Sequence, residues 1–156
     1  MKINTINPLV GLARYESWKS GWMEKENVDE YSYISDVCNP EDVLLSCKLF
    51  FPDFVVVGEG VFLESKYDGD IFDSWFKQFG GDLQAAEKMI NHTHLYDVFD
   101  GCMEDIDDRV FKQLADVLAL SWRLVLNDKF PDRRFNVDVS SSDQDYGPVV
   151  TFYQIG

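Results

Sequence analysis

The feature that most constrains the fold is a long amphipathic pattern between residues 104 and 128. Apolar residues recur there at intervals of three and four for about six turns, which predicts one long helix with a single apolar face. Acidic residues at positions 104, 105, 107 and 108 fall in the predicted first turn, where they favour the positive end of the helix dipole. Such a face must be covered, so we expect this helix to lie across a β-sheet. The residues expected to face the sheet are Leu114, Leu118, Trp122 and Val125.

Short apolar segments bounded by turn residues predict the strands of that sheet. The clearest signal is Gly58-Glu59-Gly60, which stands between two apolar runs as the turn of a β-hairpin does. The alternation of apolar and polar residues over 135–139 is typical of a strand with one buried face. A polar loop over 140–147 then leads to the last strand. The expected strands are 43–51 paired with 54–65, then 94–99, and finally 133–140 paired with 148–155.

The remaining segments predict shorter helices around the sheet. Asn7-Pro8 can cap and open an N-terminal helix, whereas Tyr31 to Ile34 is expected to be a short extended piece. Apolar residues at helical spacing over 71–79 end at Gly80-Gly81, and Asp82 can cap the helix that follows. These elements predict an α+β fold, an antiparallel sheet of about five strands with three or four helices packed on it.

The chain is large enough to hold such a fold without covalent cross-links. Its 156 residues are ordinary for one domain, so we expect a single domain over 1–156, and 46% of the residues are hydrophobic. Cys38, Cys47 and Cys102 form neither a Cys-x-x-Cys motif nor an even set, which favours reduced thiols in the cytoplasm. No apolar run approaches the ~20 residues that span a bilayer, and the N-terminus lacks the apolar core of a signal peptide. We expect a cytoplasmic protein with no cofactor.

The strong negative charge of the chain disfavours some classes of binding partner and favours others. Fourteen Lys and Arg residues face 28 Asp and Glu residues, for a formal net charge of −14. Binding to nucleic acid through phosphates requires clustered Lys and Arg, and the one adjacent basic pair is Arg133-Arg134. Anionic membrane surfaces are disfavoured for the same reason. A basic protein partner is favoured through long-range attraction, whereas the simpler interpretation is that acidity keeps a small protein in solution.

Two groups of residues could form the surface for such a partner. The first is a run of carboxylates with no basic residue between positions 97 and 108, and the second is a set of N-terminal aromatics with little periodicity. Tyr and Trp often anchor protein interfaces, although these rings could instead pack over an edge of the sheet. The acidic run fails the spacing of a calcium-binding EF-hand, and it could equally be a solvated loop and helix cap. The candidate partner-binding residues are Asp97, Asp100, Glu104, Asp105, Asp107, Asp108, Trp18, Trp22, Tyr31 and Tyr33.

His92 and His94 form the one candidate metal site. Side chains two residues apart on a strand point to the same face, so both imidazoles could bind one zinc or copper ion. Asp97, Asp100 or Cys102 could complete the ligand set, but no His-x-x-x-His or Glu-x-x-His spacing accompanies the pair. The alternative interpretation is two histidines at a turn between a helix and a strand.

The sequence contains no recognisable catalytic motif. No Gly-x-Ser-x-Gly surrounds a serine, and the cysteines lack the local signature of a catalytic thiol. Gly58-Glu59-Gly60 is not followed by the helix start and lysine of a phosphate-binding loop. These observations favour an interaction protein. The alternative is a small enzyme or metal-binding protein that uses His92, His94 and nearby carboxylates.

The last quarter of the chain resembles a known class of proteins. It contains Trp122, Leu126, Phe130-Pro131, Arg134-Phe135-x-Val137 and Gly147-Pro148-x-x-Thr151-Phe152-Tyr153. This arrangement is similar to small acidic bacterial proteins, some of which are immunity proteins that neutralise a toxin in the same cell. The resemblance implies an inhibitor that occludes the active site of a basic toxin, with carboxylates against the partner's Lys and Arg and aromatics in its cleft. It implies no catalytic residue.

Overall fold

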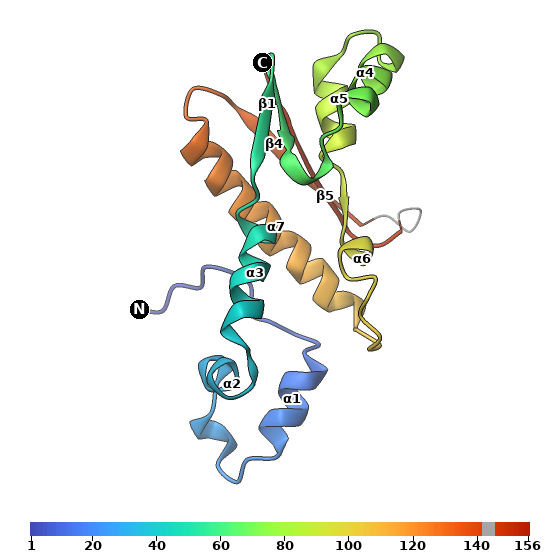
Figure 1. Cartoon of the computed structure of the whole chain (residues 1–156). Helices are drawn as coiled ribbons and strands as arrows, with labels where there is room; N and C mark the ends of the chain where they lie inside the picture. The colour runs from blue at the N-terminus through green and yellow to red at the C-terminus, as the bar shows by residue number, and fades with distance from the viewer. Residues whose placement is uncertain (142–145) are drawn as a thin grey trace.

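The computed structural model describes residues 1–141 and 146–156 (Figure 1), and it has the α+β character that the sequence predicts. The α-helices are α1 (Ala13–Ser20), α2 (Glu30–Val37), α3 (Pro40–Phe50), α4 (Gly69–Gln78), α5 (Leu83–Ile90), α6 (Leu95–Val98) and α7 (Asp108–Lys129). The strands are β1 (Phe54–Val57), β2 (Gly60–Leu63), β3 (Thr93–His94), β4 (Phe135–Ser140) and β5 (Val149–Gln154). Two 3-10 helices span Lys25–Asn27 and Glu64–Lys66. The predicted loop over 140–147 lies partly outside the described residues.

The five strands of the described chain form two small antiparallel sheets, so the expected single five-stranded sheet is wrong. β1 pairs with β2, and β5 lies between β3 and β4. A buried side chain of α5 explains the break. Glu87 accepts hydrogen bonds from the backbone N–H of Val61 in β2 at 2.8 Å and of Gln154 in β5 at 2.7 Å. The helix thereby takes up backbone groups that strand pairing would otherwise use.

Asn91, the residue directly after α5, makes a similar bridge one turn beyond Glu87. Its Oδ1 accepts from the backbone N–H of Leu63 in β2 at 2.8 Å. Its Nδ2 donates to the carbonyls of Val61 and Phe152, at 3.1 and 3.2 Å. Since Glu87 and Asn91 are both fully buried, these bonds join the two sheets inside the protein.

α7 lies across the three-stranded sheet, and its apolar face forms much of the core. Leu118 and Trp122 are buried against Phe152 of β5, while Leu114 is partly buried. The rings of Trp122 and Phe152 meet edge to face, with centroids 5.9 Å apart. Trp122 also donates from Nε1 to the carbonyl of Leu49 at 2.8 Å, which ties α3 to α7. The predicted packing of Trp122 toward the sheet is confirmed.

The start of α7 differs from the prediction. Asp107 is the N-cap, and its carboxylate accepts from the backbone N–H of Arg109 at 2.8 Å. Because this cap fixes where the helix begins, Glu104 and Asp105 precede the helix and only Asp108 lies in its first turn.

The segment predicted as a strand over 43–51 is helical. α3 begins at Pro40, and the side chain of Asn39 accepts from the backbone N–H of Glu41 at 2.8 Å. An Asn cap followed by Pro in the first turn favours a helix, and this local signal outweighs the apolar density of the segment. The predicted pairing of 43–51 with 54–65 is therefore wrong, whereas the predicted hairpin turn at Gly58-Glu59-Gly60 is confirmed, since β1 pairs with β2 there. The second hairpin, β4 with β5, is confirmed.

The predicted extended piece at Tyr31 to Ile34 is part of α2. Asp29 and Ser32 form a reciprocal capping box: the Asp29 carboxylate accepts from the Ser32 backbone N–H at 2.9 Å, and the Asp29 N–H donates to the Ser32 hydroxyl. α4 and α5 lie where the sequence predicts them, with Asp82 capping α5.

Two further predictions, a strand over 94–99 and a helix that opens at Asn7-Pro8, are wrong. The strand expected over 94–99 is confined to Thr93–His94, because β3 pairs with β5 over only these two residues before α6 begins. Asn7-Pro8 does not open a helix, and α1 begins at Ala13. No helix in the described part of the chain has both the length and the apolar character required to cross a membrane.

Candidate partner-binding site

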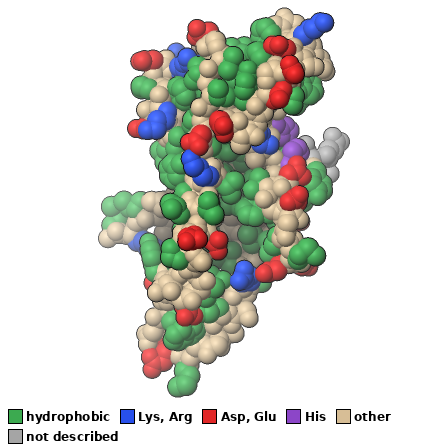
Figure 2. Space-filling view, viewed as in Figure 1, with side chains coloured by type: hydrophobic (Ala, Val, Ile, Leu, Met, Phe, Trp, Pro, Cys, Tyr) green, Lys and Arg blue, Asp and Glu red, His purple; other side chains and the backbone are tan. Residues whose placement is uncertain are grey.

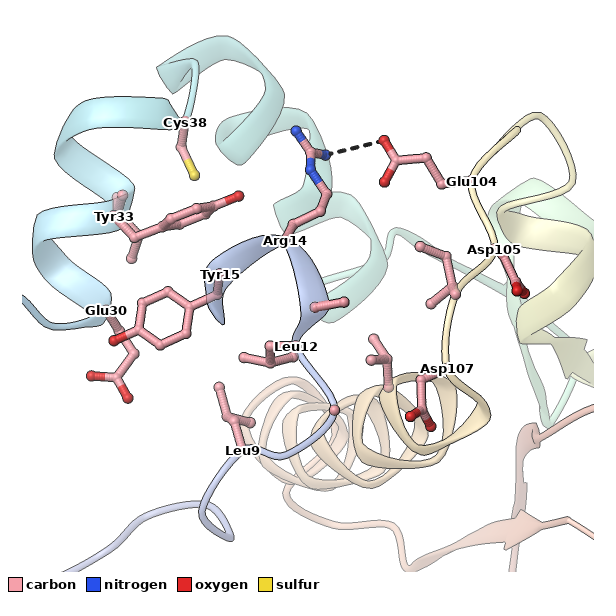
Figure 3. A pocket seen from close by; sticks show the side chains of 15 residues that line it. Leu9, Leu12, Arg14, Tyr15, Glu30, Tyr33, Cys38, Glu104, Asp105 and Asp107 are labelled. Carbon is pink, nitrogen blue, oxygen red and sulfur yellow. Dashed lines mark ion pairs between the residues drawn. The ribbon is translucent and has the colours of Figure 1, made fainter. Parts of the chain in front are cut away.

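A pocket of about 400 Å³ lies between the N-terminal helices and the start of α7 (Figure 3). Three segments that are distant in the sequence build it: residues 9–15, α2 with the residue that follows it, and the stretch that leads into α7. The apolar part of the lining includes Leu9, Leu12, Ile34, Ile106 and Val110. Cys38 also lines the pocket.

Charged side chains stand around this apolar wall. Arg14 of α1 reaches toward Glu104, with 3.6 Å between Nη1 and Oε1 (Figure 3). Glu30, Asp105 and Asp107 also line the pocket. Four carboxylates therefore accompany one guanidinium among the lining residues. Figure 2 shows the molecule hollowed between the N-terminal helices and the rest of the chain, with acidic and basic side chains around the hollow.

Asp107 is part of the fold as well as of the pocket. Its carboxylate accepts from Nη2 of Arg109 at 2.6 Å and caps α7 through the Arg109 backbone N–H. Hydrogen bonds from the Arg109 side chain and then from its backbone lower the pKa of Asp107 to about 2. Gly11, at φ +74°, packs on this pair, since a Cβ there would lie 3.2 Å from the Asp107 carboxyl group.

The other acidic residues of the predicted surface are exposed but do not act as one group. Asp97 lies in α6 and Asp100 just after it, both exposed. Asp108 accepts from the Tyr96 hydroxyl at 2.6 Å, and this hydrogen bond raises the pKa of Tyr96. The structure thus brings Glu104, Asp105 and Asp107 to the pocket, and Asp97, Asp100 and Asp108 are not part of its lining.

Three of the four predicted aromatic residues, Trp18, Trp22 and Tyr33, form an aromatic cluster with Tyr15 between α1 and α2, and Tyr31 is not part of it. Trp18 is central: its ring centroid lies 6.0 Å from that of Tyr15, 5.2 Å from that of Tyr33 and 5.6 Å from that of Trp22. Its Nε1 donates to the Asp36 carboxylate at 2.8 Å. These contacts hold α1 on α2, which stand apart from the sheets (Figure 1).

The candidate aromatics differ in what they can offer a partner. Tyr33 lines the pocket, and Trp18 belongs mainly to the contact between α1 and α2. Trp22 is 45% exposed and Tyr31 is 80% exposed, so these two rings are available at the surface. The prediction of an exposed aromatic surface fits Trp22 and Tyr31 better than Trp18.

The candidate metal site consists of two stacked imidazole rings. The centroids of His92 and His94 lie 4.5 Å apart, with 20° between the ring planes. Nδ1 of His94 is 3.3 Å from the carbonyl of Tyr146. Among residues 1–141 and 146–156, no group of three or more His, Cys, Asp or Glu side chains is placed to hold a metal ion. The expected third ligands Asp97, Asp100 and Cys102 are therefore not brought to the histidines.

Sequence reasoning missed most of the pocket. Arg14 and Ile34 carry no motif, and they meet the stretch before α7 only through the tertiary fold. The one available signal was the Asp29–Ser32 capping box, which would have predicted α2 and thus placed Glu30, Tyr33 and Ile34 on a helix. Comparison of this chain with protein-family models, with curated proteins and with solved structures finds no match.

Proposed function

We propose that this protein is a non-enzymatic interaction module of the immunity type, which inhibits a basic toxin in the cytoplasm by covering its active site. The observation that carries the proposal is the pocket beside α1 and α2, where an apolar wall is accompanied by four carboxylates and one cation. An apolar centre with a polar rim is the usual anatomy of a protein interface.

The helices beside the pocket support the same function. α1, α2 and α3 contain no buried residue. Isolated helices of this length are only marginally stable in water. Burial of apolar surface stabilises a protein by roughly 25 cal/mol per Å². A partner seated here would therefore stabilise this end of the molecule. The apolar side chains exposed along it are Trp22, Tyr31, Ile34, Val37, Val43, Leu44 and Leu45.

The charge of the chain supports rapid association with a basic partner. A net charge of −14 attracts such a protein at long range. Exposed Asp105 lines the pocket, and Asp97 and Asp100 are exposed in α6 and just after it. In the complex, these carboxylates pair with Lys and Arg around the toxin's active site, and Trp22 and Tyr31 enter its cleft. Occlusion of this kind requires no catalytic residue in the inhibitor.

Co-expression tests this proposal. The product of each gene next to this one is expressed in a bacterial host, with and without this chain. We expect one product to stop growth alone and to be tolerated with this chain, and the purified pair to bind more weakly as salt is added. If every neighbouring product is harmless, or if a toxic one is neither bound nor neutralised, the proposal is wrong.

A further inference from the structure

We infer that the pocket receives a large apolar side chain from a basic segment of the partner, and that a Lys or Arg of that segment replaces Arg14 beside Glu104. The inference rests on the proposed function and deepens it, because it states the chemistry that the partner presents. Its basis is the combination of an apolar wall, an acidic mouth and one weak ion pair across that mouth.

The apolar wall sets the size of the group that enters. The pocket volume of about 400 Å³ lies near the lower end of the ~300–1,000 Å³ typical of small-ligand sites. This space suits one or two side chains and excludes a whole secondary-structure element. Leu12, Ile106 and Val110 offer no hydrogen bond from their side chains, so this wall favours a leucine or aromatic side chain over a polar one.

The charges at the mouth select a basic neighbour for that apolar group. Of the four carboxylates in the lining, Asp107 is matched by Arg109 at 2.6 Å, and Glu104 is matched by Arg14. Within the described chain, Glu30 and Asp105 are in no ion pair. An acidic or neutral segment would leave these charges unmatched, so charge complementarity points to a basic segment.

The Arg14–Glu104 ion pair is weak enough for a cation of the partner to replace Arg14. Its N–O distance of 3.6 Å exceeds the ~2.7–2.9 Å of a charge-assisted hydrogen bond. The two side chains are 68% and 53% exposed, and ion pairs exposed to this extent contribute little to stability. A partner cation that is fixed by the apolar anchor next to it loses less freedom than Arg14 does, and it therefore competes well for Glu104.

This exchange gives the two members of one ion pair opposite effects on binding. Glu104→Gln removes the group that receives the incoming cation, so affinity for a basic ligand should fall about three- to five-fold. Arg14→Gln removes both the competitor and a like charge, so affinity should rise by a similar factor. If the pair served only to hold α1 in place, both substitutions would weaken binding.

Synthetic helical peptides serve as probes on the full chain. The test peptide is an acetylated, amidated amphipathic helix of leucine and lysine. Two control peptides replace every lysine with glutamate or every leucine with glutamine, and decanoate serves as an apolar anion. Dissociation constants come from calorimetry. Occupancy of the pocket comes from the alkylation rate of Cys38 in a Cys47→Ser/Cys102→Ser variant, because Cys38 lines the pocket.

We expect the leucine–lysine peptide alone to bind and to slow Cys38 alkylation. We expect Arg14→Gln to tighten binding and Glu104→Gln to weaken it. Lys77→Gln and Glu64→Gln make the same charge changes at exposed positions outside the pocket lining and should leave binding unchanged. The inference is overturned if the two pocket variants shift affinity in the same direction, or if decanoate or the glutamate peptide binds equally well. A toxin that is neutralised by wild type, and that wild type and both variants bind with equal affinity, would overturn this inference and leave the proposed function intact.

Discussion

The side chain of Gln113 holds the backbone of Val10 at both of its polar groups. Gln113 Oε1 accepts from the Val10 N–H at 2.8 Å, and Nε2 donates to the Val10 carbonyl at 2.8 Å. The Gln113 side chain in α7 thus pairs with the backbone of the N-terminal segment in the same way as the backbone of a neighbouring strand would in a sheet. Because Leu9 lines the pocket, the contact also fixes one side of the candidate site.

Gln113→Ala should release the N-terminal segment from α7. Two partly exposed hydrogen bonds are lost, so we expect about 1–2 kcal/mol less stability. Hydrogen exchange should show the Val10 amide losing its protection while the amides of β5 keep theirs. Gln113→Glu retains the acceptor and serves as the intermediate control. A Val10 amide that stays equally protected in Gln113→Ala would contradict the role given to this contact.

Trp122→Ala should be among the most destabilising substitutions in this chain. Trp122 is 3% exposed, so its removal leaves a cavity against Phe152 and deprives the Leu49 carbonyl of its donor. We expect a loss of ~3–5 kcal/mol in urea unfolding. Leu124→Ala on the same helix is the matched control, since Leu124 is 62% exposed and should change stability by less than about 0.5 kcal/mol. Equal losses for the two variants would refute the packing described for α7.

Asp107 should make stability depend on pH in the acid range. Its pKa in the folded protein is about 2, below the ordinary value of 3.8, so the ionised form stabilises the fold above about pH 4. That stabilisation is lost as the pH falls toward 2. Asp107→Asn keeps an N-cap but cannot form the ion pair with Arg109.

Urea midpoints measured between pH 5 and pH 2 distinguish the two proteins. We expect the midpoint to fall less steeply in Asp107→Asn than in wild type. A residual slope remains, because a hydrogen bond from the Ser32 backbone also lowers the pKa of Asp29. Parallel curves for wild type and variant would show that Asp107 does not contribute to acid unfolding.

Neutralising the solvated acids should slow association and leave folding unchanged. Asp97, Asp100 and Asp105 are exposed and belong to no ion pair within the described chain. Their replacement by Asn should lower the on-rate for the toxin identified by co-expression and flatten its dependence on salt. Stability should stay within about 0.5 kcal/mol. Identical on-rates and salt slopes for wild type and variant would show that these three residues do not contribute to association.

The metal hypothesis gives a thermal prediction. A zinc ion that bound only the folded protein would add ~2.7 kcal/mol of stability at one hundred times its dissociation constant. Among residues 1–141 and 146–156 no group of three or more possible ligands is placed to hold a metal ion. Since we favour the interpretation of His92 and His94 as two histidines at a turn, we expect zinc to leave the melting temperature unchanged. A zinc-dependent rise that disappears in His92→Ala and His94→Ala would favour the alternative of a metal-binding protein or small enzyme.

Periodic elements could be predicted from the sequence, and the candidate pocket could not. α7 and the β4–β5 pair repeat one pattern over many residues, so a single irregular residue does not hide them. α3 was missed because its apolar residues are dense enough to suggest a buried strand, although Leu44 and Leu45 are 72% and 70% exposed. The meeting of Arg14 with Glu104 depends on how α1 is placed against the stretch before α7, which no local pattern encodes.

The bridge that Glu87 and Asn91 make between β2 and β5 also bears on aggregation. The side of a strand that carries unpaired N–H and C=O groups is a template for a strand of another molecule. The two side chains occupy such groups on β2 and β5 at once, from inside the fold. α5 therefore protects both strands against intermolecular pairing. Cleavage or local unfolding of α5 would expose these backbone N–H and C=O groups of β2 and β5 together. Unpaired groups of this kind favour pairing with strands of other molecules, as in amyloid-like assemblies.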